Sequence, residues 1–481
     1  LMSIFTLTLM MAGVVAADEV VINFWHHQDV YKAPDGIGYQ AIQEFNKRHK
    51  GEIRINLNWM ATTQFQSALR TALSTGDLPD IFHSNQIPLM SLLKEDILLP
   101  LNDIVPDNWV DRFEEGAFVE NVNMKDGKYY SWPERGLGHP GIMLYNKDVL
   151  REAGLDPVPP KTWEEFREIN RKVTEAGQGK YYGTILGGRD DGLQALRFFA
   201  VTADPYQDAR WSAISGLAFW DYKTGRYKFD TDDTYKAFKF IIDLKKDGYI
   251  FPGSTSIKKA EARQMWALGA AAFHIEPHWC IRARVANNPD GDFGVTHLPV
   301  PKEGMKAYFP SLFASADYYV SANRKHPKEI GIFIDEVLTG EVTFRGFIEN
   351  GIVLTSNEEW NSRADLYPTP QFRKYVELTK ENITIEPFAG SKNPDVLKAL
   401  VLIDVKPDIV EFLQEIFATD GVDLKQKLVD YNAKWEAALD EAITEVNSQG
   451  MNVSREDLIF PNWDPARNYL TEDLEELLNQ K

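Results

Sequence analysis

Aromatic and polar side chains gather in five short segments of this chain, and their combination points to carbohydrate chemistry. A sugar ring presents apolar C–H faces and many hydroxyl groups, so its site needs aromatic platforms beside planar polar groups. Histidine, carboxylate, amide and guanidinium groups supply the hydrogen bonds for the hydroxyls. We therefore take as candidate ligand-binding residues Trp25, His26, His27, His83, Asn85, Trp132, Glu134, Arg189, Asp190, Glu276, His278 and Trp279.

Residues 274–278 allow a sharper alternative, a metal site. In a strand, His274, Glu276 and His278 would share one face because side chains alternate with a period of two. Pro277 interrupts this strand, however, and no HExxH motif or second carboxylate cluster adds further ligands. We therefore predict no bound metal and no cofactor.

A secreted glycoside hydrolase is the rival functional class, since it would also be rich in tryptophan and acidic residues. Such an enzyme needs two carboxyl groups about 5–5.5 or 6.5–9.5 Å apart. From the sequence, Glu134 and Glu276 are the candidates for such a pair, but no catalytic motif accompanies them. The single cysteine, Cys280, lies in an apolar context typical of a buried residue. The sequence favours binding without catalysis, and a binding protein for a peptide, polyamine or metal is a further alternative.

The elements that must position the first candidates form an alternating strand–helix pattern. Strands are predicted at 20–25, 53–59 and 78–82, and amphipathic helices at 38–49 and 62–74. This order is typical of a parallel α/β sheet. Ligands of such sheets lie beyond the carboxyl ends of the strands, so the polar loops after the first and third strands are expected to meet at one edge.

The second half of the chain repeats this pattern. Strands are predicted at 182–186 and 270–276, and helices at 232–246 and 261–268. A loop between them contains two consecutive glycines but lacks the spacing of a nucleotide-binding motif. A long helix at 423–446 carries apolar residues at spacings of three and four, which we assign to the core.

Residues 136–166 separate the two halves and combine four signals in a fixed order. Glycines and a proline at 136–141 make a flexible crossing, and residues 142–145 form an apolar run typical of a buried strand. A short helix ends at Gly154, and Thr162 with Glu165 forms a capping box that begins the next helix.

The segment YNKDVLREAGLDPVPPKTWEEF at residues 145–166 closely resembles the extracellular solute-binding proteins of ABC transporters, the family of maltose-binding protein. GDLPDIFHSN at 76–85 resembles the GxxPD motif of that family, and the resemblance extends from about residue 20 to 448. It implies a two-lobed α/β periplasmic-binding-protein fold (type II), each lobe a mostly parallel sheet flanked by helices. The ligand would lie in the cleft between the lobes, which close by hinge motion.

The resemblance also implies a division of the chain and a set of partners. One lobe would combine 18–138 with 317–365, and the other 139–316 with 366–481, after a signal peptide at 1–17 that the apolar segment near the start predicts. In AAAFHIEPHW, Trp279 matches the family tryptophan that stacks on the sugar, whereas His278 stands where the family has proline. The expected partners are a small carbohydrate ligand and the membrane permease subunits of an ABC transporter, with the binding protein itself a monomer.

The net charge and the first residues of the chain limit the possible binding partners and the cellular location of the protein. Its 481 residues include 71 acidic and 52 basic side chains, a formal net charge of −19, which argues against nucleic acid and anionic membrane surfaces as partners. The apolar segment at 4–15, followed by small residues, is typical of a signal peptide and too short to span a bilayer. Because no lipobox cysteine follows it, we predict a periplasmic or extracytoplasmic protein without a lipid anchor.

Overall fold

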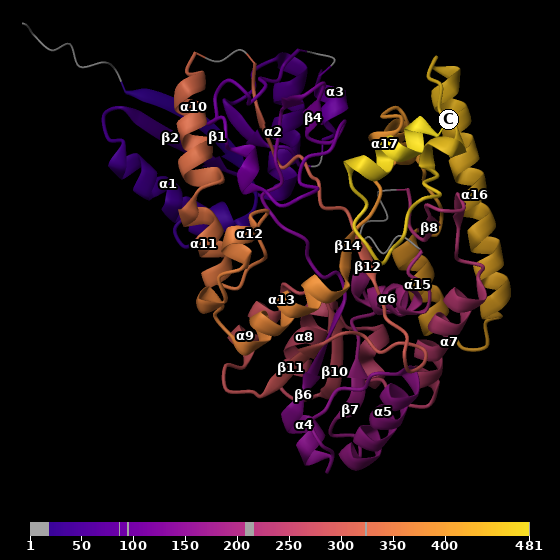
Figure 1. Ribbon diagram of the computed structural model, residues 1–481. Coiled ribbons are helices and arrows are strands. Elements are labelled where there is room, and N and C mark those ends of the chain that lie inside the picture. The colour runs from indigo at the N-terminus through magenta and orange to yellow at the C-terminus, as the bar shows by residue number, and fades with distance from the viewer. Residues whose placement is uncertain (1–18, 86, 94–95, 207–215, 323–324, 481) are drawn as a thin grey trace, which may run out of the picture.

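Two lobes, each built on a four-stranded sheet, make up the computed structural model (Figure 1). The structure describes residues 19–85, 87–93, 96–206, 216–322 and 325–480. The predicted signal peptide at 1–17 therefore lies outside the described residues.

The first lobe has the strand order β13-β3-β1-β2, with β1 (Val20–His26), β2 (Ile53–Trp59), β3 (Ile81–His83) and β13 (Tyr318–Val320). The first three strands are parallel, as the alternating pattern predicts, and β13 runs antiparallel to β3. Helices α1 (Ile37–Arg48) and α2 (Thr62–Thr75) connect them. β3 begins three residues later than predicted, because Pro79 has no N–H group for a sheet ladder.

The second lobe has the strand order β11-β6-β10-β7, with β6 (Ile142–Asn146), β7 (Tyr182–Ile185), β10 (Ala271–Glu276) and β11 (Phe293–Thr296). β10 pairs with β7 in parallel, whereas β6 runs antiparallel to both of its neighbours. Three of the four strands thus share one direction. The reversed strand lies inside the sheet, so two of the three strand pairings are antiparallel and the sheet is mixed.

In each sheet the reversed strand is the one that the chain enters after crossing from the other lobe. β6 follows the glycine-rich crossing at 136–141, and β13 follows the return crossing that ends at residue 317. Beyond β6, the side chain of Asn146 accepts backbone N–H bonds at the start of α4 (Lys147–Glu152). Thr162 and Glu165 form the predicted capping box of α5 (Trp163–Gly177).

Smaller elements complete the lobes and their connections. No helix in the part of the chain that the structure describes has the length and apolar character needed to cross a bilayer. The remaining elements are α3 (Leu89–Leu93), β4 (Met124–Lys125), β5 (Lys128–Tyr129), α6 (Gln194–Ala203), β8 (Trp220–Asp221), β9 (Arg226–Tyr227), α7 (Asp232–Lys246), α8 (Lys259–Ala267), α9 (Cys280–Asn287), β12 (Phe309–Ser311), α10 (Pro327–Phe333), α11 (Glu341–Glu349), α12 (Glu358–Asn361), α13 (Pro370–Asn382), β14 (Ile383–Ile385), α14 (Val396–Leu402), α15 (Ile409–Ala418), α16 (Leu424–Ser448) and α17 (Thr471–Asn479).

The C-terminal segment packs against the second lobe. In Figure 1, α16 runs down the right-hand side past β8 and α7, and α17 lies above them. Phe460, Trp463 and Leu477 from the last residues of the chain join the same apolar core cluster as Phe166 and Phe273 of the second lobe. The lobe boundaries given above stay a prediction. The predicted apolar stripe of α16 is buried in this cluster and consists of Leu428, Tyr431, Trp435, Leu439, Ala442 and Val446.

Candidate ligand-binding cleft

β1 ends in a buried hydrogen-bond network centred on His26. The His26 Nδ1 atom accepts the backbone N–H groups of His27 and Gln28, both at 3.0 Å. Its Nε2 atom therefore carries the proton and donates it to the Tyr318 hydroxyl at 3.1 Å. Burial lowers the pKa of His26 well below its usual value, and nearby His83 lowers it further. His26 is thus a neutral core residue, which corrects the prediction that it lies in an open loop.

Glu134 closes this network from the first crossing. Its Oε1 atom accepts hydrogen bonds from the hydroxyls of Tyr31 at 2.7 Å and Tyr318 at 2.5 Å, and its backbone N–H donates to Asp317 Oδ2 at 2.8 Å. Burial raises the pKa of Glu134, against the opposing effect of the Arg135 charge and the two tyrosine hydrogen bonds. The carboxylate therefore joins the crossing to β13, and in this conformation its Oε1 atom is already occupied.

Trp132 was predicted to bind the ligand, but the structure buries it. Its ring is fully buried, stacks on Tyr318 with centroids 5.0 Å apart, and meets Trp109 edge-on at 5.8 Å. A ring enclosed in this way offers no face to a ligand. Trp25 lies in β1, within the strand predicted at 20–25, and it packs partly buried against the apolar cluster that contains Phe65.

The predicted polar residues after β1 and β3 do come together. The His83 ring centroid lies 4.9 Å from that of His26 and 4.7 Å from that of His27. His83 Nδ1 accepts the backbone N–H of Asn85 at 2.9 Å, and Asn85 adopts a positive φ of 50°, which asparagine tolerates well. Burial lowers the pKa of His83 well below its usual value. This cluster is therefore neutral and mostly enclosed.

Arg135 is linked to the histidine cluster through Gln28, which lies 3.0 Å from His83 Nε2, and sequence reasoning missed it. Its side chain is 42% exposed, and its guanidinium donates a hydrogen bond to Gln28 Oε1. The positive charge of Arg135 contributes to the lowered pKa values of His26, His27 and His83 in the first lobe and of His278 in the second. One accessible cation thus acts on groups of both lobes.

On the second lobe, Glu276 at the end of β10 is held by three side chains. Its Oε1 atom lies 3.1 Å from His274 Nε2, and its Oε2 atom accepts hydrogen bonds from Arg263 at 3.2 Å and from the Cys280 thiol at 3.0 Å. Burial alone would raise the pKa of Glu276, but His274 and Arg263 bring it down to about 2. Burial and the Glu276 charge raise the pKa of Cys280 far above its usual range, so its thiol is a poor nucleophile.

His278 is turned away from this group. Its Nδ1 atom lies 3.1 Å from the His139 carbonyl oxygen, and its ring stacks on Tyr375 at 4.7 Å with an interplanar angle of 4°. β10 ends before Pro277, so His274, Glu276 and His278 do not continue one strand face. Burial lowers the pKa of His278 to about 4. Within the described ranges, no group of three His, Cys, Asp or Glu residues could hold a metal ion.

The other candidates of the second lobe lie in loops at one edge of its sheet, because β7 and β10 are parallel and end on the same side. Trp279 is the N-cap residue of α9 and is 48% exposed. Arg189 is exposed in the loop after β7. Asp190 has a local role, since its Oδ1 atom accepts the backbone N–H of Lys259 at 3.0 Å and so fixes the start of α8.

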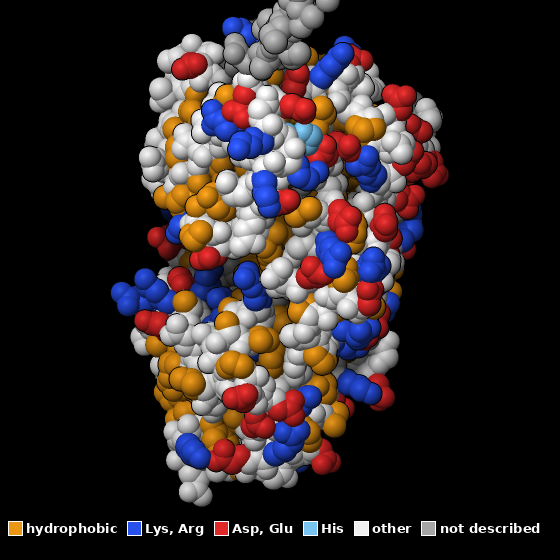
Figure 2. All heavy atoms as spheres, turned by 90° about the vertical axis from the view of Figure 1, so that its left-hand side faces the viewer, with side chains coloured by type: hydrophobic (Ala, Val, Ile, Leu, Met, Phe, Trp, Pro, Cys, Tyr) orange, Lys and Arg blue, Asp and Glu red, His pale blue; other side chains and the backbone are white. Residues whose placement is uncertain are grey.

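A hollow of about 370 Å³ is lined by residues of both lobes, and none of the twelve candidate residues is among those that line it. Figure 2 shows the surface hollowed between its upper and lower halves, with Lys and Arg side chains beside the hollow. Arg282 follows Trp279 by one helical turn, so both lie on one side of α9. The lining residues include Asp29, Lys32 and Asp35 of the first lobe, Arg282 of the second, and Ile352 of the connection after α11.

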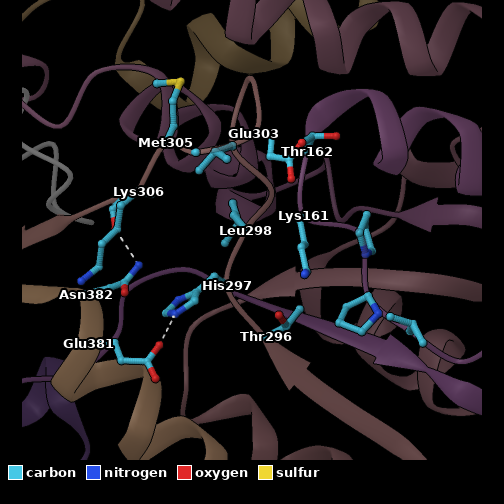
Figure 3. Close-up of a pocket in the computed structure, with 16 residues that line it drawn as sticks. Lys161, Thr162, Thr296, His297, Leu298, Glu303, Met305, Lys306, Glu381 and Asn382 are labelled. Carbon is cyan, nitrogen blue, oxygen red and sulfur yellow. Dashed lines mark hydrogen bonds and ion pairs between the residues drawn. The ribbon is translucent and has the colours of Figure 1, made fainter.

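A second cavity of about 530 Å³ lies within the second lobe, and none of the twelve candidate residues lines it. Figure 3 shows His297, Glu381 and Asn382 on one side of it and Lys161 on the other. His297 Nε2 lies 3.0 Å from Glu381 Oε2, and the ring centroid of His297 lies 6.0 Å from that of His139 in the first crossing. This cavity therefore adjoins the hinge but is separate from the predicted site.

Comparison with known proteins decides the family. The family model for bacterial extracellular solute-binding proteins matches residues 33–342. The chain belongs to this family. Among curated solute-binding relatives, the arabinooligosaccharide-binding protein of Bacillus subtilis (strain 168) is 26% identical over 314 residues, which cover 62% of this chain and 66% of that protein. The sn-glycerol-3-phosphate-binding periplasmic protein of Salmonella typhimurium is 28% identical over 369 residues, 75% of this chain and 76% of that protein.

Solved structures confirm the two-lobed solute-binding fold. The sugar-binding protein MalE from Xanthomonas citri matches with a TM-score of 0.62 at 17% identity, over 90% of this chain and 100% of that one. A chitin oligosaccharide binding protein matches with a TM-score of 0.61 at 18% identity, over 88% and 100%. At these identities the likeness shows the fold alone. The chain spans just under two thirds of the length of the first curated relatives, 66% and 64%.

In this solute-binding protein, the charged residues of the hollow were not among the sequence candidates. Arg282 could have been found, because it lies one helical turn after Trp279. Asp29 is the last residue of the polar segment predicted at 25–29, but it was not taken as a site residue. Lys32 and Asp35 carry no local signal that separates them from ordinary surface charge, since only the fold brings them opposite α9.

Proposed function

We propose that this solute-binding protein binds a sugar or oligosaccharide between its lobes and delivers it, unchanged, to the permease of an ABC transporter. Trp279 carries the proposal, because its half-exposed indole lies on the same side of α9 as Arg282, which lines a hollow shared by both lobes. The indole offers a face for sugar C–H groups, and the exposed guanidinium groups of Arg135 and Arg189 offer donors for hydroxyls. A ligand that contacts both lobes favours the closed arrangement in proportion to its preference for it.

The names of relatives support a carbohydrate ligand. One relative is named for arabinooligosaccharides, and solved structures of this fold were obtained with maltotriose and with raffinose. The two carboxylates considered for a hydrolase are each engaged by side chains of their own lobe, Glu134 by two tyrosines and Glu276 by His274 and Arg263. These contacts favour binding without catalysis. We further propose that the protein acts as an exported monomer and that its closed form docks on the permease.

A thermal-shift screen with product analysis tests this proposal. The panel contains arabinotriose, maltotriose, chitotriose, raffinose and sn-glycerol 3-phosphate, each at several concentrations. A ligand at 100 times its dissociation constant stabilises the folded state by about 2.7 kcal/mol, a shift of a few degrees. We expect a shift with at least one saccharide that is recovered intact. Conversion of the sugar would support a hydrolase, and a shift with sn-glycerol 3-phosphate but with no saccharide would contradict a sugar ligand.

A further inference from the structure

Charges of opposite sign face the hollow from the two lobes. Asp29 and Asp35 belong to the segment between β1 and α1, whereas Arg282 lies on α9 of the second lobe. Within the described part of the chain, no carboxylate oxygen lies within ion-pair distance of the Arg282 guanidinium, and no cation lies within that distance of Asp29 or Asp35. All three residues line one volume of about 370 Å³, Asp29 and Asp35 from the first lobe and Arg282 from the second.

Lys32 does not neutralise these carboxylates. It lines the same hollow, but its ammonium lies 4.9 Å from the centre of the Trp59 ring, and no ion pair joins it to a described carboxylate. Arg135, the other cation of this region, is bound to Gln28 and lies 4.0 Å from Glu134. Asp29 and Asp35 therefore keep their charge available for a partner that approaches from the second lobe.

We propose that Arg282 forms an ion pair with Asp29 or Asp35 when the lobes close, and that this contact sets ligand affinity without contacting the ligand. The proposal rests on the hinge closure of the proposed function. Closure shrinks the hollow and shortens the distance between the charges, so their attraction is gained only in the closed form. An exposed ion pair of this kind changes an equilibrium constant by about 1.4- to 5-fold. Arg282, Asp29 and Asp35 are thus positioning residues for closure.

Salt separates this contact from ordinary ligand contacts. The screening length falls from about 10 Å at 0.1 M salt to about 3 Å at 1 M, so the proposed pair weakens as NaCl is added. Hydrogen bonds between a neutral sugar and the protein carry no such dependence on ionic strength. Salt-dependent closure around an uncharged ligand is therefore the signature of charges that meet across the hollow.

The experiment measures the distance between spin labels on the two lobes, at Ser74→Cys in α2 and Glu164→Cys in α5, both exposed positions. The native Cys280 is buried and stays in place. Distances are recorded at 20 mM and 1 M NaCl, without ligand and with 10 mM arabinotriose. At low salt we expect Arg282→Gln to lower the ratio of closed to open molecules about two- to fivefold, and 1 M NaCl to remove the difference between variant and wild type.

Two further sets of variants make the result specific. The charge swap Arg282→Asp with Asp35→Arg, or with Asp29→Arg, should restore closure and identify the partner. Lys50→Gln removes an exposed cation that precedes β2, at the opposite end of the first sheet, and should change nothing. Equal closed-to-open ratios in wild type and Arg282→Gln under all conditions would overturn the proposal. Absence of any response to arabinotriose or another sugar would instead count against the sugar-binding function, whatever the effect of salt.

Discussion

Replacing Trp279 with alanine is the most direct test of the site. Trp279 is 48% exposed, so about half of its side-chain surface is available to a ligand. A tryptophan presents roughly 150–250 Å², and a sugar ring that covers the exposed half would remove roughly 100 Å² from water, worth about 2.5 kcal/mol at ~25 cal/mol per Å². A sugar stacks on one face only, which reduces the gain to about 1.2 kcal/mol. We therefore expect affinity to fall about eightfold.

The assay is isothermal titration of wild type, Trp279→Ala and Trp279→Phe with the saccharide that gives the largest thermal shift. Trp279→Phe keeps an aromatic face and should lose less affinity than Trp279→Ala. Trp360→Ala, a change of equal size in α12 and outside the proposed site, is the matched control and should bind normally. Because Trp279 is half exposed, its removal should leave the melting temperature of the free protein nearly unchanged. Equal affinity in Trp279→Ala and wild type would refute the reasoning and remove this residue from the site.

Three further predictions concern stability, each measured by urea denaturation. Tyr318→Phe leaves the buried Glu134 carboxylate without one donor, so we expect a loss of about 1–3 kcal/mol; Tyr145→Phe serves as control, and an equal loss there would contradict the network. Burial lowers the pKa of His26 and His83 in the folded protein. The unfolded chain therefore binds protons at a higher pH than the folded one, and the free energy of unfolding should fall as pH drops below about 6.5. A free energy of unfolding that stays constant between pH 7.5 and 5 would contradict this prediction. The pKa of Glu276 is lowered to about 2, so its stabilisation is complete above about pH 4.3 and lost as pH falls toward 2; Glu276→Gln should remove that part of the acid dependence.

Local signals were enough to predict most of the elements near the site. The helix at α2 ends where Gly76 takes a φ of 75°, and α5 begins at the capping box of Thr162 and Glu165, as their residue types indicate. β2 has the predicted bounds because its alternation of apolar and polar residues is unbroken. These features depend on neighbours a few residues away, so sequence alone can reveal them.

The burial of single polar residues could not be predicted in the same way. His26 continues the inward alternation of Ile22 and Phe24 and meets Tyr318, a residue 292 positions later in the chain. A histidine at that position is equally consistent with an open loop until the partner is known. Trp132 poses the same problem, because its stacking on Tyr318 also depends on β13 returning from the other lobe. The errors therefore concern contacts that only the crossings create.

The crossings also explain why the site and the hinge share residues. The segment at 135–136 runs against the connection at 354–355, with a backbone hydrogen bond of 2.9 Å from Gly136 to Leu354. A Cβ atom on Gly136 would lie 2.2 Å from the Thr355 carbonyl oxygen, so only glycine permits this approach. Gly138 likewise packs on the His278 ring, directly before Trp279. Rotation of the lobes about these segments would therefore move Arg135 and Trp279 relative to each other. Any ligand that fixes their separation stabilises one hinge angle, so that affinity and closure are two measures of the same free energy.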